Sequence, residues 1–341
     1  MELFVVGSGR CGSTLLGNML DKHPDLCTIS EFFSALDRFE VFSAAAVPGE
    51  TFASFLDRPD ISSELFVNRG IIPVELMTTS SGGVPPLMIA TLPGKFTDPA
   101  AVYAEILAKV RAFPRQTYKQ HYEALFGLLM ERTGTRYWLE RSGLSVDNLA
   151  EYYRMYPEGK YVFLHRDGPD SAMSMMKHLS FEWYISEHFC PLTREEILAT
   201  EYGGQAVSDR DPITVRLSPD YMPLEKYAEY WSYQQILGFK TLAQMNPDQF
   251  IMVRYEDVLS DTGATLRRIA EFFGLPERDG WVDEASAMIV SSHASEFEAL
   301  PRATREAVKR ACEAGERLLG RRASPWDVCR SRTMWNDSFR V

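Results

Sequence analysis

Three features are missing from this sequence, and each absence excludes a class of protein. No two of its five cysteines form a Cys-x-x-Cys pair, so neither a zinc site nor a disulfide framework is indicated, and a reducing compartment fits best. The net charge is -11, so the chain lacks the positive field that sequence-independent nucleic-acid binding requires. No apolar run reaches transmembrane length, and the short N-terminal run follows Glu2, unlike a signal peptide. We therefore expect a cytoplasmic protein with no integral membrane segment and no nucleic-acid partner.

The pattern of apolar residues predicts an α/β protein. Residues 2–6 are typical of a strand, residues 13–20 of a helix and residues 26–29 of a second strand, which is the order of a parallel sheet. Further strands are predicted at 136–139, 161–164 and 250–254, and further helices at 146–156, 170–177, 224–242, 263–273 and 302–319.

The organisation of the chain is predicted as a single domain over residues 1–341, although this length also suits two smaller domains. Residues 34–135 mix aromatics, prolines and short amphipathic segments, including the loop Ser80–Pro86. We expect a central parallel sheet flanked by helices, a three-layer sandwich like that of P-loop NTPases. Residues 34–135 would be a largely helical insertion that covers the functional site as a lid.

A glycine-rich turn joins the first predicted strand to the first helix. Its sequence is Gly7-Ser8-Gly9-Arg10-Cys11-Gly12-Ser13-Thr14. Such a turn directs several backbone N–H groups to one point, where the helix dipole adds partial positive charge, so it predicts an anion site. The triphosphate-binding pattern G-x-x-x-x-G-K-[ST] has its lysine where this chain has Ser13. The cation lies three residues earlier instead, at Arg10.

A second strand–turn–helix segment begins at Tyr161. It carries Arg166 at the end of the strand, where open α/β sheets bind ligands, and Ser174 within the helix. An arginine fork and a hydroxyl can converge on one phosphate. Strand-end arginines also pair with neighbouring carboxylates, so this segment alone is a weak indication.

Together the two segments resemble the signature elements of sulfotransferases that use 3′-phosphoadenosine-5′-phosphosulfate (PAPS). Gly9 to Thr14 is similar to the 5′-phosphosulfate loop of the family, and Arg166-Asp167-Gly168-Pro169-Asp170-x-x-x-Ser174 to its 3′-phosphate motif. Arg254–Val258, followed by Thr265–Pro276, resembles the late strand–helix unit of the family. Two departures stand out: Cys11 replaces the usual serine, and Gly168 displaces the proline by one position.

The resemblance implies in-line transfer of a sulfuryl group from PAPS to an acceptor hydroxyl, with adenosine-3′,5′-bisphosphate as product and no metal. The residues that it implies for PAPS binding are Gly9, Arg10, Cys11, Gly12, Ser13, Thr14, Arg166 and Ser174. Arg10 is also expected to act in catalysis, by stabilising the charge that develops on the leaving phosphate.

A general base must take the proton of the acceptor hydroxyl. Glu31 is the first candidate because it ends the second predicted strand, at the sheet edge that carries the glycine-rich loop, and because some members of the family use a glutamate. His178 is the second candidate, since other members use a histidine. The remaining histidines considered are His121, His165 and His293, of which His165 fits a packed core position better.

The acceptor is predicted only as a class. If the apolar side chains of the insertion and of the segment after the second motif line the pocket, the acceptor is a small-molecule, lipid or carrier-bound alcohol. These side chains are Phe32, Phe33, Phe39, Phe42, Phe52, Phe55, Phe66, Leu87, Met88, Ile89, Phe181, Trp183 and Tyr184. Tyr227, Tyr230 and Trp231 share a helix face that fits core packing better than an adenine slot.

Two other functions remain open at this point. One is a P-loop kinase or other NTPase, which the missing lysine disfavours, and the other is a non-catalytic anion-binding protein of the same fold. The sequence leaves the oligomeric state undetermined.

Overall fold

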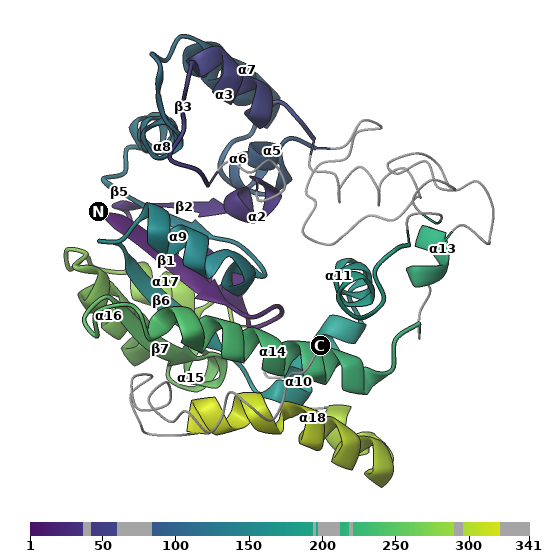
Figure 1. Cartoon of the computed structure of the whole chain (residues 1–341). Helices are drawn as coiled ribbons and strands as arrows, with labels where there is room; N and C mark the ends of the chain where they lie inside the picture. The colour runs from purple at the N-terminus through teal and green to yellow at the C-terminus, as the bar shows by residue number, and fades with distance from the viewer. Residues whose placement is uncertain are drawn as a thin grey trace.

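A five-stranded parallel sheet forms the centre of the protein (Figure 1). The computed structural model describes residues 1–36, 42–59, 84–193, 196, 212–217, 221–289 and 296–320. The strands are β1 (Glu2–Gly7), β2 (Leu26–Ser30), β5 (Tyr137–Arg141), β6 (Lys160–His165) and β7 (Phe250–Arg254), in the spatial order β2-β5-β1-β6-β7. The predicted strands and the predicted α/β class are confirmed, with small shifts at the strand ends.

Helices make up most of the remaining described chain. The longer ones are α1 (Ser13–Leu20), α3 (Gly49–Leu56), α7 (Pro99–Arg111), α8 (Tyr118–Thr133), α10 (Gly168–Met176), α11 (Leu179–Phe189), α14 (Leu224–Leu242), α16 (Thr262–Phe273) and α18 (Arg302–Gly320). The shorter ones are α2 (Phe32–Leu36), α5 (Pro86–Ile89), α6 (Thr91–Lys95), α9 (Leu149–Met155), α13 (Pro212–Arg216), α15 (Tyr255–Ser260), α17 (Trp281–Ser286) and the 3₁₀ helices η2 (Ser145–Asn148) and η3 (Glu296–Ala299). Among these described helices, none combines the length and the apolar character needed to cross a membrane.

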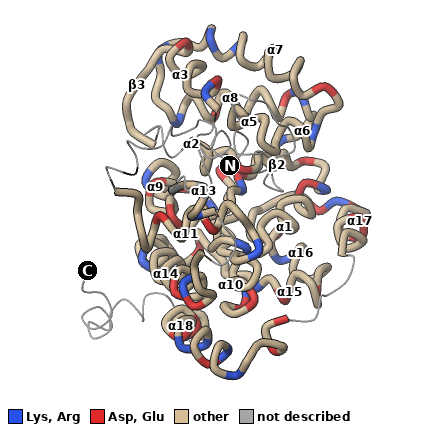
Figure 2. Tube along the Cα trace, turned by 90° about the vertical axis from the view of Figure 1, so that its right-hand side faces the viewer, with Lys and Arg blue, Asp and Glu red and all other residues tan. Residues whose placement is uncertain are grey.

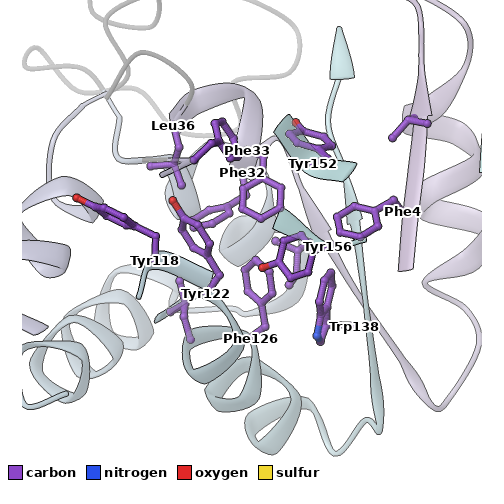
Figure 3. Packing of buried hydrophobic residues seen from close by; sticks show 14 of the residues in the cluster. Phe4, Phe32, Phe33, Leu36, Tyr118, Tyr122, Phe126, Trp138, Tyr152 and Tyr156 are labelled. Carbon is purple, nitrogen blue, oxygen red and sulfur yellow. The ribbon is translucent and has the colours of Figure 1, made fainter. Parts of the chain in front are cut away.

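Both faces of the sheet are covered, because successive residues of a strand point to opposite sides. Leu3 and Val5 of β1 pack with α1, α16 and α17, whereas Phe4 and Val6 pack with α8, α9 and α14. Figure 3 shows Phe4 within an aromatic cluster that includes Trp138. Burial on both faces explains why the strands are continuous apolar runs instead of alternating ones.

Two predicted helices differ from the observed ones at their first turn. Residues 146–156 form η2 and then α9, with the 3₁₀ turn closed by Asp147 N–H donating to the Leu144 carbonyl at 3.0 Å. The helix predicted from Asp170 begins at Gly168 because Asp167 caps it and a proline occupies its first turn.

The described part of the 34–135 insertion packs beside the β2 edge of the sheet (Figure 1). It is mainly helical, with one small antiparallel pair, β3 (Ala46–Val47) and β4 (Gln116–Thr117). The Thr91 hydroxyl bonds to the backbone N–H of Ser30 at 2.8 Å and to its carbonyl at 2.9 Å, so α6 covers the outer edge of β2. The role of the insertion as a lid stays a prediction, and most of the predicted loop Ser80–Pro86 lies outside the described residues.

Candidate active site

The candidate site lies where the carboxyl ends of the parallel strands meet. The glycine-rich loop follows β1, Glu31 follows β2, Arg141 ends β5 and Arg166 follows β6. Because β5 lies between β2 and β1, Arg141 stands in register with Ser30 on one side and Val5 on the other. Figure 2 shows acidic and basic residues interspersed along the described trace.

The loop after β1 has the backbone of an anion site. Arg10 has φ 57° and Gly12 has φ 93°, while Cys11 between them has negative φ. Alternating handedness of this kind directs successive N–H groups into one concave nest. Within the described chain, helix α1 starts at Ser13 with neither a side-chain cap nor an acidic residue in its first turn. Its N-terminal N–H groups and dipole therefore favour an anion at this point.

Two details of the loop follow from close packing. A Cβ atom on Gly12 would come within 2.1 Å of the Tyr255 ring, so glycine is required there for space as well as for its φ. The Cys11 side chain is buried in the core beneath the loop, and burial raises the pKa of its thiol to about 11. Cys11 therefore contributes backbone to the loop and no thiolate.

The two predicted phosphate elements converge. The Arg10 side chain reaches from the loop to α10, where its Nε donates to the Ser174 hydroxyl at 3.2 Å. Arg166 Nη1 lies 3.4 Å from the Arg10 carbonyl, and the Arg166 guanidinium stacks over the Tyr255 ring at 5.0 Å. Two guanidinium groups and one hydroxyl from distant parts of the chain thus gather beside the nest.

Two backbone amides in the turn that carries the displaced proline donate to carboxylates. The N–H of Asp167 donates to Glu256 at 3.0 Å, and that of Gly168 donates to Glu316 at 3.1 Å. Burial raises the pKa of both Asp167 and Glu316. These two amides are engaged, so an anion beside α10 relies on the side chains of the second motif.

Glu31 is held in an unusual backbone conformation by several donors. Its φ is 55°, in the left-handed region that side chains other than glycine rarely adopt. Oε1 accepts from Arg141, while Oε2 accepts from the Gly143 N–H at 2.8 Å and from the Ser34 hydroxyl at 3.3 Å. An ionised carboxylate offers about four acceptor positions, so these three donors leave about one for a further hydroxyl.

Arg141 connects Glu31 to the glycine-rich loop, and the sequence reasoning missed it. Its Nη1 bonds both to Glu31 and, at 3.1 Å, to the Thr14 hydroxyl at the start of α1. Its side chain is only 3% exposed. The predicted strand 136–139 stopped short of this residue. A strand extended by two positions would have shown the same signal as Arg166, a basic residue at a strand's carboxyl end.

The histidines occupy different surroundings. His178 is buried at the start of α11, and its ring packs edge-on against Phe181 at 5.4 Å. Phe181 lies against Gly9 of the loop, because a Cβ atom on Gly9 would come within 2.0 Å of its ring. Burial lowers the pKa of His165 to about 4, which fits the predicted core position. His121 is stacked on Phe52 inside the insertion at 4.5 Å.

His293 lies outside the described residues. Among the apolar side chains considered for the acceptor pocket, Phe39 and Phe66 also lie outside them. Several of the others are buried among one another in the hydrophobic core, namely Phe32, Phe33, Phe42, Phe52 and Leu87. Figure 3 shows Phe32 and Phe33 packed with Tyr122 and Phe126 in that core. Their number is therefore explained by packing, and they give no support to an apolar pocket.

The aromatic residues of α14 are also buried. Tyr227, Tyr230 and Trp231 are at most 4% exposed, which fits the core interpretation.

Glu140, beside Arg141, gives a prediction about pH. It is fully buried, and its Oε1 accepts from the Phe33 N–H and the Ser142 hydroxyl. Burial raises its pKa from 4.5 to about 8, against the effect of these hydrogen bonds. The native state therefore keeps a proton that the unfolded chain releases near pH 4.5. This contribution to stability is complete below about pH 4.5 and is lost as the pH rises to about 8.

Glu140→Gln, which has no proton to lose, should therefore remove this loss. The variant's Tm minus that of the unsubstituted protein should increase between about pH 5 and about pH 8, as followed by circular dichroism. Parallel Tm curves over this range would show that Glu140 titrates alike in the folded and unfolded chains.

The comparisons with known proteins agree with the resemblance in the sequence. Residues 205–279 match the sulfotransferase family. This segment includes α14, β7, α15 and α16, and so contains the late strand–helix unit but neither phosphate element. The match confirms the predicted family resemblance. A search of curated proteins found no match.

Solved structures with similar chains are also sulfotransferases. The sulfotransferase domain from the curacin biosynthetic pathway has 14% identity and a TM-score of 0.46, covering 94% of this chain and 97% of that chain. Sulfotransferase STF9 from Mycobacterium avium has 13% identity and a TM-score of 0.46, with 94% and 76% covered. A sulfotransferase from Alicyclobacillus acidocaldarius has 16% identity and a TM-score of 0.40, with 96% and 98% covered.

Proposed function

We propose that this chain, a sulfotransferase by its family match, takes its sulfuryl group from PAPS and transfers it to an acceptor hydroxyl. The observation that carries the choice of donor is the convergence of Arg10, Arg166 and Ser174 on the nest after β1. A nucleotide with phosphates at both ends needs two anion sites, and these groups come from the two segments that resemble the family's phosphate elements.

The residues near the nest suit the two charged ends of PAPS. The nest, with its left-handed Arg10 and Gly12, suits the 5′-phosphosulfate, and Arg166 with Ser174 suits the 3′-phosphate. The position of the triphosphate-binding lysine is Ser13, which disfavours an NTPase. PAPS, when bound, supplies a sulfuryl group on a phosphate leaving group.

In this proposal, different residues stabilise the leaving phosphate and take the proton of the acceptor. Arg10 and the loop N–H groups offer fixed positive charge where negative charge develops on the leaving phosphate. Glu31 accepts the proton of the acceptor hydroxyl, with Arg141 and Gly143 holding its carboxylate in place. Arg141 also bonds to Thr14, so the proposed base and the proposed donor loop are fixed to one side chain. His178 is the alternative base, separated from the loop by Phe181.

Calorimetric titration with adenosine-3′,5′-bisphosphate and with ATP–Mg²⁺ tests the choice of donor. The bisphosphate should bind, ATP should bind far more weakly, and Arg166→Ala should weaken bisphosphate binding about 10- to 100-fold because a charge-assisted contact is lost. Arg132→Ala is the matched control, because it removes one arginine from the outer side of α8, where Arg132 pairs with Glu105. Tight ATP binding without bisphosphate binding would identify an NTPase instead.

The acceptor stays a class in this proposal: a small-molecule, lipid or carrier-bound alcohol. Turnover of labelled PAPS with a panel of sugar, phenol, lipid and acyl-carrier alcohols would identify it. Bisphosphate binding without turnover of any alcohol would favour the non-catalytic anion-binding protein.

A further inference from the structure

We propose that Gln234 on α14 is a positioning residue that sets the conformation of the donor loop. Its side chain is fully buried, and its Oε1 accepts the Gly9 N–H at 3.1 Å. Gly9 directly precedes Arg10, whose left-handed φ begins the nest. The bond engages the Gly9 amide and so helps to hold the strained residue that follows.

Asp147 determines which way the Gln234 amide faces. Gln234 Nε2 donates to Asp147 Oδ1 at 3.1 Å, and the Tyr230 hydroxyl donates to Asp147 Oδ2 at 2.9 Å. A carboxylate only accepts hydrogen bonds, so it selects the amide orientation that leaves Oε1 toward Gly9. Burial and the neighbouring Asp147 raise the pKa of Tyr230 well above its ordinary value, which keeps the hydroxyl as a donor.

The same short segment holds the loop at a second point. The Gly7 N–H donates to the Ser145 hydroxyl at 3.1 Å, and Ser145 and Asp147 both belong to η2. The loop is thus bonded through alternate amides, at Gly7 and Gly9, to groups outside the nest. The chain has built this support from α14 and η2, which are far from the loop in sequence.

This inference rests on the proposed donor, and its test compares two buried glutamines on one helix. Gln234→Leu leaves the Gly9 N–H without its acceptor, so adenosine-3′,5′-bisphosphate should bind about 10- to 100-fold more weakly and the KM for PAPS should rise in proportion. Gln235→Leu is the control. Gln235 is also fully buried, and its amide has no hydrogen-bond partner among the described residues. Its removal should leave both quantities unchanged.

A conservative variant separates positioning from general destabilisation. In Gln234→Glu, the protonated carboxyl can donate to Asp147 and accept from Gly9 as the amide does, whereas the ionised form repels Asp147. The other titratable groups at this network are Tyr230, Tyr233 and His188. The bisphosphate affinity of Gln234→Glu, relative to the unsubstituted protein, should therefore recover as the pH falls from about 9 to about 6.

Three outcomes decide the matter. Selective loss in Gln234→Leu, with recovery of Gln234→Glu at low pH, supports the inference. Equal binding by Gln234→Leu and Gln235→Leu, or an affinity of Gln234→Glu that follows the unsubstituted protein at every pH, overturns it. Failure of the unsubstituted protein to bind the bisphosphate would instead refute the proposed donor, and that titration is made first.

Discussion

Arg10→Ala should lower kcat about 10²- to 10³-fold, the usual effect of removing one preorganised donor from a developing oxyanion. The Arg10 side chain extends from the nest to Ser174 and so lies between both proposed phosphate positions. Alanine keeps the Cβ atom and therefore the same left-handed strain, so the backbone changes little. Initial rates at saturating PAPS, with Tm measured in parallel, give the result.

Two further variants make the Arg10 result specific. Lys22→Ala removes an exposed cation just beyond the far end of α1 and should leave kcat unchanged. Arg10→Lys retains the charge but loses the planar fork, so it should recover only part of the activity. Full activity of Arg10→Ala would place the stabilising charge elsewhere.

Glu31→Gln should lower kcat about 10²- to 10⁴-fold, because the amide cannot take the proton of the acceptor. Glutamine can still accept from the Gly143 N–H, but Arg141 loses its buried ionic partner, and such a loss costs about 3–5 kcal/mol. Unfolding must therefore be followed alongside the rates, at a temperature where the variant is folded.

Glu140→Gln is the matched control for Glu31→Gln. Glu140 lies in β5, the strand that pairs with the β2 strand preceding Glu31. Its Oε1 accepts from the Ser142 hydroxyl and the Phe33 N–H, and its Oε2 has no partner among the described residues. The substitution should leave kcat near its original value at neutral pH. If Glu31→Gln were as active as this control, the base would have to be sought at His178.

Elements with a distinctive local residue pattern could be predicted from the sequence alone. Strand β1 is a short apolar run, and the loop after it combines glycines with one cation, so both could be placed from the printed residues. Arg166 was found because it directly follows a strong strand, and Ser174 because the turn with Pro169 predicts the start of a helix before it. The third segment, around Arg254, is where the family match falls.

Other contacts depend on strand order, which no local pattern reveals. Arg141 meets both Glu31 and Thr14 only because β5 lies between β2 and β1, although β5 follows them by about a hundred residues of chain. Gln234 likewise has the pattern of an ordinary helix residue until α14 packs against the loop. Phe32 and Phe33 could not be assigned from the sequence either, because an apolar pair beside a candidate base has the same pattern whether it lines a pocket or fills a core. The structure places both in the core.

The neighbouring positions of Glu140 and Arg141 make the register of one strand decisive for the chemistry. Glu140 stands opposite Phe4 and Ile29, whereas Arg141 stands opposite Val5 and Ser30, on the other face of the sheet. Side chains alternate along a strand, so a slip of β5 by one residue moves both side chains to the opposite face of the sheet. The slip would turn the guanidinium toward the face with the aromatic rings, and in one of the two directions it would set the Glu140 carboxylate against the base and the donor loop. A single-residue insertion or deletion in β5 would thus remove the cation from the centre of the site, although the protein's overall composition would hardly change.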